Sequence, residues 1–260
     1  MLVLMMRMRW LALFVLFGFF LPGLPGLASP TASRGPILIR SVEDIYGLAS
    51  GFGTAAAPFI IEDLRVDANG DPFGILIANI SCPLIVRNLE VYGASIAALR
   101  VQNVKNLVVE NLVLRGSLTG ILLGGSRNVT IKRVRIENCP DGIRVMFSQA
   151  VNIEGTTVDK AEVGVWFQGV TNSAVRKSLI QGCGIGLLFE LESTGNIVAG
   201  NIFLKNRIHA QSCGGNQFDD GERGNFWEGF AAKDENSDGI WDEPYPVGLD
   251  ADRFPLVSRP

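Results

Sequence analysis

Oxygen-bearing side chains alternate along a short acidic segment near the C-terminus. They follow the order D-x-N-x-D-G-x-x-D, carried by Asp234, Asn236, Asp238, Gly239 and Asp242. Alternate oxygen ligands on a tight turn suit a hard cation such as Ca²⁺, and the backbone carbonyl of Ile240 would be the next ligand. In an EF-hand calcium loop, the twelfth residue is a glutamate that binds the ion with both oxygens. Counted from Asp234, the twelfth residue of this segment is Tyr245, so a bidentate ligand would come from Glu243, Asp250 or Asp252. We predict a structural calcium site here; the alternative is an Asp/Asn/Gly-rich turn that closes the fold without an ion.

Arginine, tryptophan and a few polar side chains recur through the middle of the chain. The residues that could bind a ligand are Arg100, Arg144, Trp166, Gln168, Glu190 and His209. A lyase or glycosidase needs paired carboxylates, or a base with carboxylate-neutralising groups, and Glu190 is the single acid of this set. We therefore predict binding without catalysis. Two alternatives stay open: a polysaccharide-active enzyme, and an apolar strip that the N-terminal segment covers.

An internal repeat predicts the elements that carry these residues. The segments GILI, ALRV, GILL, GIRV, GVWF and GLLF begin at Gly74, Ala98, Gly120, Gly142, Gly164 and Gly186, with spacings of 24, 22, 22, 22 and 22 residues. Each unit holds three short segments of alternating hydrophobicity separated by Gly, Ser and Asn, which leaves no room for a helix. A unit this small buries its apolar face only by stacking on its neighbours. The chain is therefore predicted to form an all-β, right-handed parallel β-helix.

Stacking assigns each side chain to the inside or the outside of the helix. We expect about six to seven turns over residues 58–218, with six side chains pointing inward: Ile121, Leu123, Ile143, Val145, Val165 and Phe167. In each unit, one outward residue lies between the first two inward residues, and these outward residues are predicted to stack into a row. The row is Leu76, Arg100, Leu122, Arg144, Trp166 and Leu188, with His209 on a seventh turn. A second outward row alternates in charge and predicts a ladder that favours in-register stacking: Arg87, Glu110, Lys132, Glu154 and Arg176.

The two ends of the chain differ from the repeats. Residues 1–28 have the basic start, apolar run and small-residue cleavage site of a signal peptide, so we expect an exported protein, periplasmic or extracellular, that meets the membrane only through this signal. Residues 29–57 are predicted to cap the β-helix at residues 58–218, and residues 219–260 form an acidic C-terminal tail.

The part of the mature chain before this tail is nearly neutral, so it lacks the basic surface that nucleic-acid binding requires. The cysteine spacings match no zinc site, and Cys139 and Cys183 are predicted to be free thiols.

Three stretches together resemble the NosD-like family of exported β-helix proteins. They are GTAAAPFIIEDLRVDANG at residues 53–70, the GI repeats, and the ending NQFDDGERGNFWEGF…DENSDGIWDEPYPV…DADRFPL. The resemblance implies periplasmic copper handling as an accessory to nitrous oxide reductase maturation, and the repeats are similar to those of carbohydrate-binding and sugar-hydrolysis β-helices. Copper favours His, Cys and Met ligands. Past the signal, the chain holds one histidine, His209, and one methionine, Met146, on turns predicted to be three apart.

These observations leave two classes of function. The first is a non-catalytic extracytoplasmic scaffold or binding module whose partner is a polysaccharide or a protein. The second is a polysaccharide-active enzyme, a lyase or glycoside hydrolase, which the fold permits. The absence of a carboxylate pair in the outward row favours the first.

Overall fold

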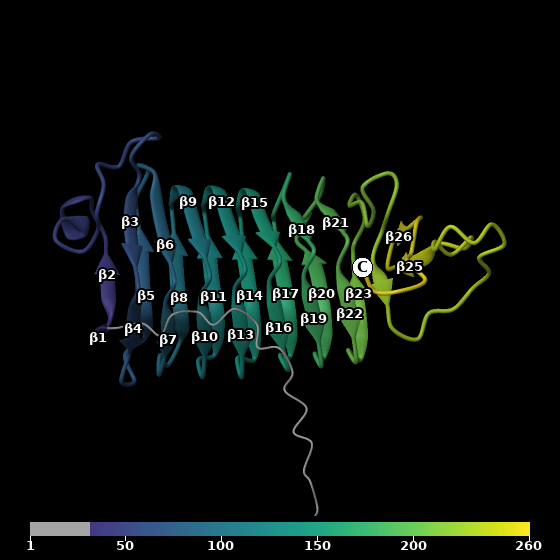
Figure 1. Cartoon of the computed structure of the whole chain (residues 1–260), viewed down its shortest axis with the longest axis horizontal. Coiled ribbons are helices and arrows are strands. Elements are labelled where there is room, and N and C mark those ends of the chain that lie inside the picture. The colour runs from purple at the N-terminus through teal and green to yellow at the C-terminus, as the bar shows by residue number, and fades with distance from the viewer. Residues whose placement is uncertain (1–31) are drawn as a thin grey trace, which may run out of the picture.

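The computed structural model describes residues 32–260, so the predicted signal peptide lies outside the described residues. The regular secondary structure of the described chain is strands, apart from one short 3-10 helix, η1 (Glu43–Ile45). The strands form three parallel sheets that extend along one axis, followed by an antiparallel hairpin (Figure 1).

Successive strands along the chain belong to the three sheets in a repeating order. Sheet A contains β1 (Ala32–Arg34), β4 (Leu64–Asp67), β7 (Glu90–Tyr92), β10 (Val113–Arg115), β13 (Arg135–Glu137), β16 (Thr157–Asp159), β19 (Leu179–Gln181), β22 (Ile202–Leu204) and β24 (Phe226–Trp227). Sheet B contains β2 (Ile37–Ile39), β5 (Phe73–Ala78), β8 (Ala97–Gln102), β11 (Thr119–Gly124), β14 (Asp141–Met146), β17 (Val163–Gln168), β20 (Ile185–Glu190) and β23 (Ile208–Gln211). Sheet C contains β3 (Phe59–Glu62), β6 (Leu84–Arg87), β9 (Lys105–Glu110), β12 (Arg127–Lys132), β15 (Gln149–Glu154), β18 (Ala174–Arg176) and β21 (Ile197–Ala199). The hairpin pairs β25 (Tyr245–Val247) with β26 (Asp250–Asp252).

The chain passes from sheet B to sheet C to sheet A in every turn. Through the central turns, each strand pairs in parallel with the strand one full turn later, as in the register Ile121–Ile143–Val165. This arrangement confirms the predicted parallel β-helix. It has more turns than the six to seven expected, because β1 and β2, within the predicted capping segment, and β24, in the tail, also pair with the stack.

The interior consists of continuous apolar columns. All six side chains predicted to point inward have at most 1% of their surface exposed, which confirms the prediction. β-Branched residues dominate these columns because they pack well on a pleated surface. Towards the C-terminus the columns become aromatic, and Phe167 and Phe189 meet edge to face at 5.2 Å.

The glycine that opens each GI segment lies in close contact with sheet A and with the next strand of sheet B. A Cβ at Gly142 would lie 2.5 Å from Cγ1 of Val158 and still closer to the carbonyl oxygen of Gly164. At Gly120 the obstacle is Cγ2 of Ile136, at 2.6 Å. The repeat therefore reflects a steric limit at the corner where sheet A meets the next strand of sheet B.

Buried side chains form hydrogen-bonded ladders along two of the corners. In one, the amide of Thr156 donates to Oγ of Ser178 at 3.2 Å, and the amide of Ser178 donates to Oδ1 of Asn201 at 2.9 Å. The amide of Asn201 in turn donates to Oδ1 of Asn225 at 3.1 Å. Each polar side chain thereby satisfies backbone groups of the preceding turn, which a buried corner requires.

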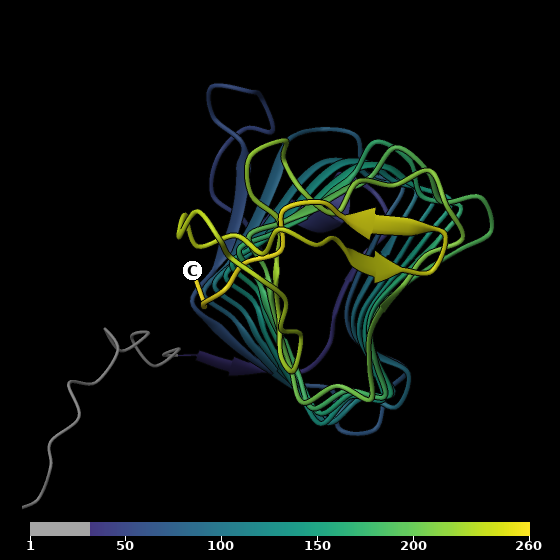
Figure 2. The same ribbon diagram turned by 90° about the vertical axis from the view of Figure 1, so that its right-hand side faces the viewer.

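The predicted acidic tail forms an ordered cap, and the hairpin β25–β26 lies across the end of the solenoid (Figure 2). Asp252 ends one ladder, since its Oδ2 accepts from the amide of Asn225 at 2.7 Å and from Nε1 of Trp227 at 2.8 Å. Asp250 ends a second ladder by accepting from the amide of Asn216 at 3.1 Å. Trp227 stacks on Tyr245 with ring centroids 4.4 Å apart, which covers the end of the core.

The charged outward row has the predicted register. Glu62 extends the row by one turn, and Nε of Arg87 donates to Oε2 of Glu62 at 2.7 Å. Lys132 and Glu110 form an ion pair at 2.6 Å. Glu154 pairs with Lys177 at 3.3 Å and not with a member of the row. Exposed pairs of this kind contribute only about 0.2–1 kcal/mol each, so they favour register more than stability.

All four cysteines of the described chain are free, as predicted for Cys139 and Cys183. Burial raises the pKa of both of these thiols, which keeps them protonated and unreactive. Over residues 32–260, no helix is long and apolar enough to cross a bilayer.

We predict that Gly142→Ala destabilises the protein by about 1–3 kcal/mol, because the added methyl group overpacks the corner between sheets A and B. Gly124→Ala is the matched control, since a Cβ there would meet Met146 at an ordinary 3.8 Å. Thermal and urea unfolding measure both variants. Equal stability of the two would show that the glycine repeat has no steric basis.

We also predict a pH dependence from Asp252. Burial raises the pKa of its carboxyl from 3.8 to about 6, and this outweighs the hydrogen bonds from Asn225, Trp227 and Phe254. The folded state then binds the proton more tightly than the unfolded state, so this group's contribution to stability falls as pH rises from about 4 to about 6. Relative to Asp252→Asn, which does not titrate, the wild type should lose about 2 kcal/mol between pH 4 and pH 7. Urea unfolding at pH 4 and pH 7 tests this, and stability curves that stay parallel would contradict it.

Candidate functional site

The predicted outward row exists on the exterior of sheet B. Consecutive strands place its members in direct register, and the row is Leu38, Leu76, Arg100, Leu122, Arg144, Trp166, Leu188 and Gln211. The sheet B strands β5, β8, β11, β14, β17 and β20 are six residues long, so a second outward position follows two residues later and adds Gln168 and Glu190 beside Trp166 and Leu188. Four of the six predicted binding residues are thereby brought together.

These four residues, Arg144, Trp166, Gln168 and Glu190, form one connected network, here called the sheet B cluster. The guanidinium of Arg144 lies 4.0 Å from the centroid of the Trp166 ring, and its Nε donates to Oε1 of Gln168 at 3.0 Å. Oε2 of Glu190 accepts from Nε1 of Trp166 at 2.9 Å and from Nε2 of Gln168 at 3.3 Å. Each side chain is held by at least two others, so the geometry of the cluster is fixed before any ligand binds.

Asp141 joins this cluster although the sequence analysis did not select it. Its Oδ2 lies 3.6 Å from Nη1 of Arg144 on the same strand. Burial raises the pKa of the Asp141 carboxyl; the Arg144 charge opposes this shift, and the negative charge of Glu162 adds to it. The available signal was its place three residues before Arg144, immediately before the GIRV segment.

Arg100 lies in the row but outside the cluster. Leu122 separates it from Arg144, and its Nη2 donates to Oε1 of Gln102 at 3.2 Å. Burial lowers the pKa of its guanidinium. Arg100 therefore extends the exposed face toward the N-terminal end without touching Trp166.

The prediction that His209 occupies the row is wrong. The register partner of Leu188 is Gln211, 23 residues later, whereas His209 lies 21 residues after Leu188 and so falls short even of the 22-residue period of the preceding turns. Nε2 of His209 donates to the carbonyl oxygen of Glu228 at 2.9 Å, and Nδ1 then accepts from Nδ2 of Asn206 at 3.3 Å. The imidazole packs near Trp227 and belongs to the C-terminal cap.

The residues present do not fit the copper site that the resemblance implies. Both ring nitrogens of His209 are engaged in hydrogen bonds, and Met146 lies on β14, three turns away from β23. Within residues 32–260, no group of three or more His, Cys, Asp or Glu side chains is placed to hold a metal ion. Copper prefers imidazole and sulfur ligands, and residues 32–260 do not bring such ligands together.

The predicted calcium residues lie on one exposed loop of the cap. Asp234 accepts from the amides of Asp238 at 3.1 Å and Gly239 at 3.2 Å, and Asp242 accepts from the amide of Glu235 at 2.9 Å. Asn236 donates to Asp238 at 2.9 Å, and Oδ1 of Asp238 accepts from the amide of Ile240 at 2.9 Å. Asp250 and Asp252, offered as bidentate ligands, are committed to the corner ladders.

One protein family matches most of the chain. The family described as periplasmic copper-binding protein (NosD) matches residues 65–232. Among solved structures, the chain is similar to a mutant DFA-IIIase from Arthrobacter chlorophenolicus A6 in complex with DFA-III, with 16% identity and a TM-score of 0.44 over 64% of this chain and 50% of that chain. The chain therefore spans about half the length of that protein. No curated protein matches the chain significantly.

Calcium binding to the 234–242 loop stays a prediction with a direct test. Millimolar calcium should raise the melting temperature relative to chelator, because the cation would neutralise the repulsion among Asp234, Asp238 and Asp242. Asp238→Ala should abolish this rise, whereas Glu222→Ala, outside the loop, should retain it. An unchanged melting temperature at millimolar calcium would reject the site.

Proposed function

The chain belongs to the NosD family, and we propose from that premise that it is an exported, non-catalytic binding protein whose sheet B cluster holds a sugar chain. The family is described as periplasmic, and the apolar N-terminal run of residues 1–28 supports export through a signal peptide. The copper association of the family does not extend to this proposal, because the donor set does not fit.

The proposal rests on the hydrogen-bond donors and acceptors of the cluster that have no partner within the described protein. Arg144 uses Nε and Nη1 within the protein, and within the described chain no acceptor engages its Nη2. Glu190 accepts both of its hydrogen bonds on Oε2, which leaves Oε1 available. A fixed donor and a fixed acceptor therefore flank Trp166. Sugar hydroxyl groups both donate and accept, so neighbouring hydroxyls match such a pair.

The exposed face around the cluster favours binding as well. Trp166 and Leu122 are partly exposed, and they offer apolar surface that can contact the apolar face of a sugar ring. Because the cluster is assembled beforehand, a ligand does not have to order these side chains when it binds. The repeats that resemble those of carbohydrate-binding β-helices are consistent with this ligand class.

A second candidate, a polysaccharide-active enzyme, is favoured by Asp141. Its raised pKa is a property of general acids, and Glu190 is a second carboxyl on the same face. Arg144 and Gln168 lie between the two in the chain of contacts and hold both carboxyls in place. Against catalysis, each carboxyl is held by donors of the protein. Release of reducing or unsaturated ends from a polysaccharide, lost in both Asp141→Asn and Glu190→Gln, would establish the enzyme.

The binding proposal predicts that Glu190→Gln weakens the affinity for a bound polysaccharide by about tenfold or more, because a charge-assisted hydrogen bond is lost. Glu154→Gln on sheet C is the matched control and should bind as the wild type does. Isothermal titration against neutral and acidic polysaccharides measures the affinity, and the fluorescence difference between wild type and Trp166→Phe locates the ligand. Saturable binding of a periplasmic protein in place of every polysaccharide would assign this face to protein docking and overturn the proposal.

A further inference from the structure

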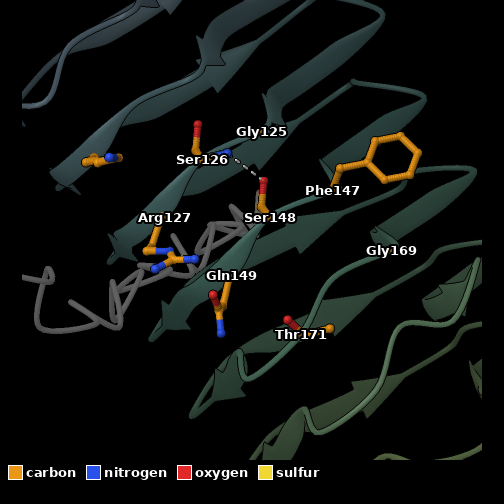
Figure 3. Close-up of a pocket in the computed structure, with 9 residues that line it drawn as sticks. Gly125, Ser126, Arg127, Phe147, Ser148, Gln149, Gly169 and Thr171 are labelled. Atoms are coloured by element: carbon orange, nitrogen blue, oxygen red, sulfur yellow. Dashed lines mark hydrogen bonds between the residues drawn. The ribbon is translucent and has the colours of Figure 1, made fainter.

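A hollow of about 560 Å³ lies at the corner where sheet B passes into sheet C (Figure 3). One side is a row in register, formed by Lys105, Arg127, Gln149 and Thr171. The other side is Phe147, whose ring points away from Arg127 in Figure 3. These five residues define the corner groove, which no part of the sheet B cluster lines.

Lys105 and Arg127 form a pair of like charges without a partner. They are register partners on β9 and β12, so their backbones lie about 4.8 Å apart. Within residues 32–260, neither takes part in an ion pair. At the other end of the same two strands, by contrast, Glu110 faces Lys132 at 2.6 Å. Like charges opposite one another destabilise a sheet, and an anion bound between them would remove the repulsion.

Phe147 is an exposed aromatic residue in a strained backbone conformation. Its φ is +45°, and 69% of its surface is exposed. The equivalent corner positions of earlier turns hold Asn79, Asn103 and Gly125, which tolerate a positive φ. A bulky side chain there costs free energy, and strain of this kind is concentrated at functional sites.

The neighbouring glycines differ in what they leave beside the Phe147 ring. A Cβ at Gly169 would lie 2.8 Å from Cδ1 of Phe147, so only glycine lets the ring lie over the next turn. At Gly125, on the preceding turn, a Cβ would have no neighbour closer than 4.0 Å. The ring therefore packs on the next turn, and the space toward the preceding turn stays open.

We propose that the corner groove binds an acidic sugar chain. The carboxylate or sulfate of the sugar lies against Lys105 and Arg127, Gln149 and Thr171 hydrogen-bond its hydroxyl groups, and the apolar face of a sugar ring packs on Phe147. A nucleic acid, which also offers anions and flat rings, needs a more extended basic surface than two cations in a near-neutral body. The inference takes the sugar class from the proposed function and adds a second, charge-selective site to it.

The first test compares one polymer in two charge states. Polygalacturonate should bind, and its fully methyl-esterified form, which has the same backbone without the charge, should bind about tenfold more weakly at low salt. Arg127→Gln should lower the affinity for polygalacturonate to that of the ester and leave the ester unaffected. Arg207→Gln, an exposed arginine outside the groove, is the control. Equal affinity for polymer and ester, or equally tight binding of single-stranded DNA, would overturn the inference.

The second test separates the role of Phe147 from its effect on folding. Phe147→Asn should raise the melting temperature by about 2–4 °C, because asparagine tolerates the positive φ, yet weaken polygalacturonate binding. Leu191→Asn is the matched control, since Leu191 has φ +50° and 59% exposure but does not line the groove. It should raise the melting temperature to a similar extent and leave binding unchanged. Unchanged binding by Phe147→Asn would remove the ring from the site.

The outcomes for the two sites are distinguishable. If Glu190→Gln abolishes binding of both polymers while Arg127→Gln has no effect, the proposed function holds and the corner groove fails. If Arg127→Gln alone abolishes binding, the corner groove holds and the sheet B cluster is not the sugar site. If neither polymer binds the wild type, both proposals are wrong.

Discussion

Parallel hydrogen bonding between successive turns is the interaction on which the rest of this structure depends. It requires each residue to lie directly above its counterpart one turn away, so a choice of side chain at one offset acts on a whole column. Residues of the interior columns must be apolar, and residues of the corner column must be small. Charged residues of an outward row must alternate in sign, because like charges on successive turns repel one another. Gly142, wedged against Val158 and Gly164, shows how narrow the tolerance is at the corner. Arg144 and Trp166 become neighbours for the same reason.

Stacking also creates a problem at the end of the solenoid, because the last turn has no successor to satisfy its polar groups. The cap solves it with two carboxylates two residues apart on one short strand. Asp250 and Asp252 receive the amide donors that a further turn would otherwise have received, and Trp227 and Tyr245 cover the apolar columns. Burying Asp252 raises its pKa, which is the energetic cost of ending the ladder with a group that can lose its proton. The acidity of the tail therefore has a structural use apart from any cation.

The sequence predicts the fold well because the length of the repeat determines which residues of successive turns lie in register. Inward residues such as Val145 and Phe167, and the outward contact of Arg144 with Trp166, follow from counting in steps of 22. His209 does not follow from this counting, since it lies 21 residues after Leu188, and the last turn is one residue longer than the period and places Gln211 in the row. Periodicity also gives no information about hydrogen bonds along a strand, which is why Asp141 was missed. The hairpin and its carboxylate ladders lie beyond the repeat, where no column was available for comparison.

Function in such a molecule is expected where a residue departs from its column without a structural reason. The exterior of a solenoid is only weakly constrained by folding, so a family can keep the stack and change its surface. The chain shows this in its departure from copper chemistry, since its one histidine of the described residues serves the cap. It shows it again at the corner between sheets B and C, where Phe147 and Leu191 both replace residues that tolerate a positive φ. Strain alone does not distinguish these two positions. Only Phe147 combines it with a hollow and an uncompensated pair of cations, so the surroundings of a strained residue, more than the strain itself, are what indicate a site.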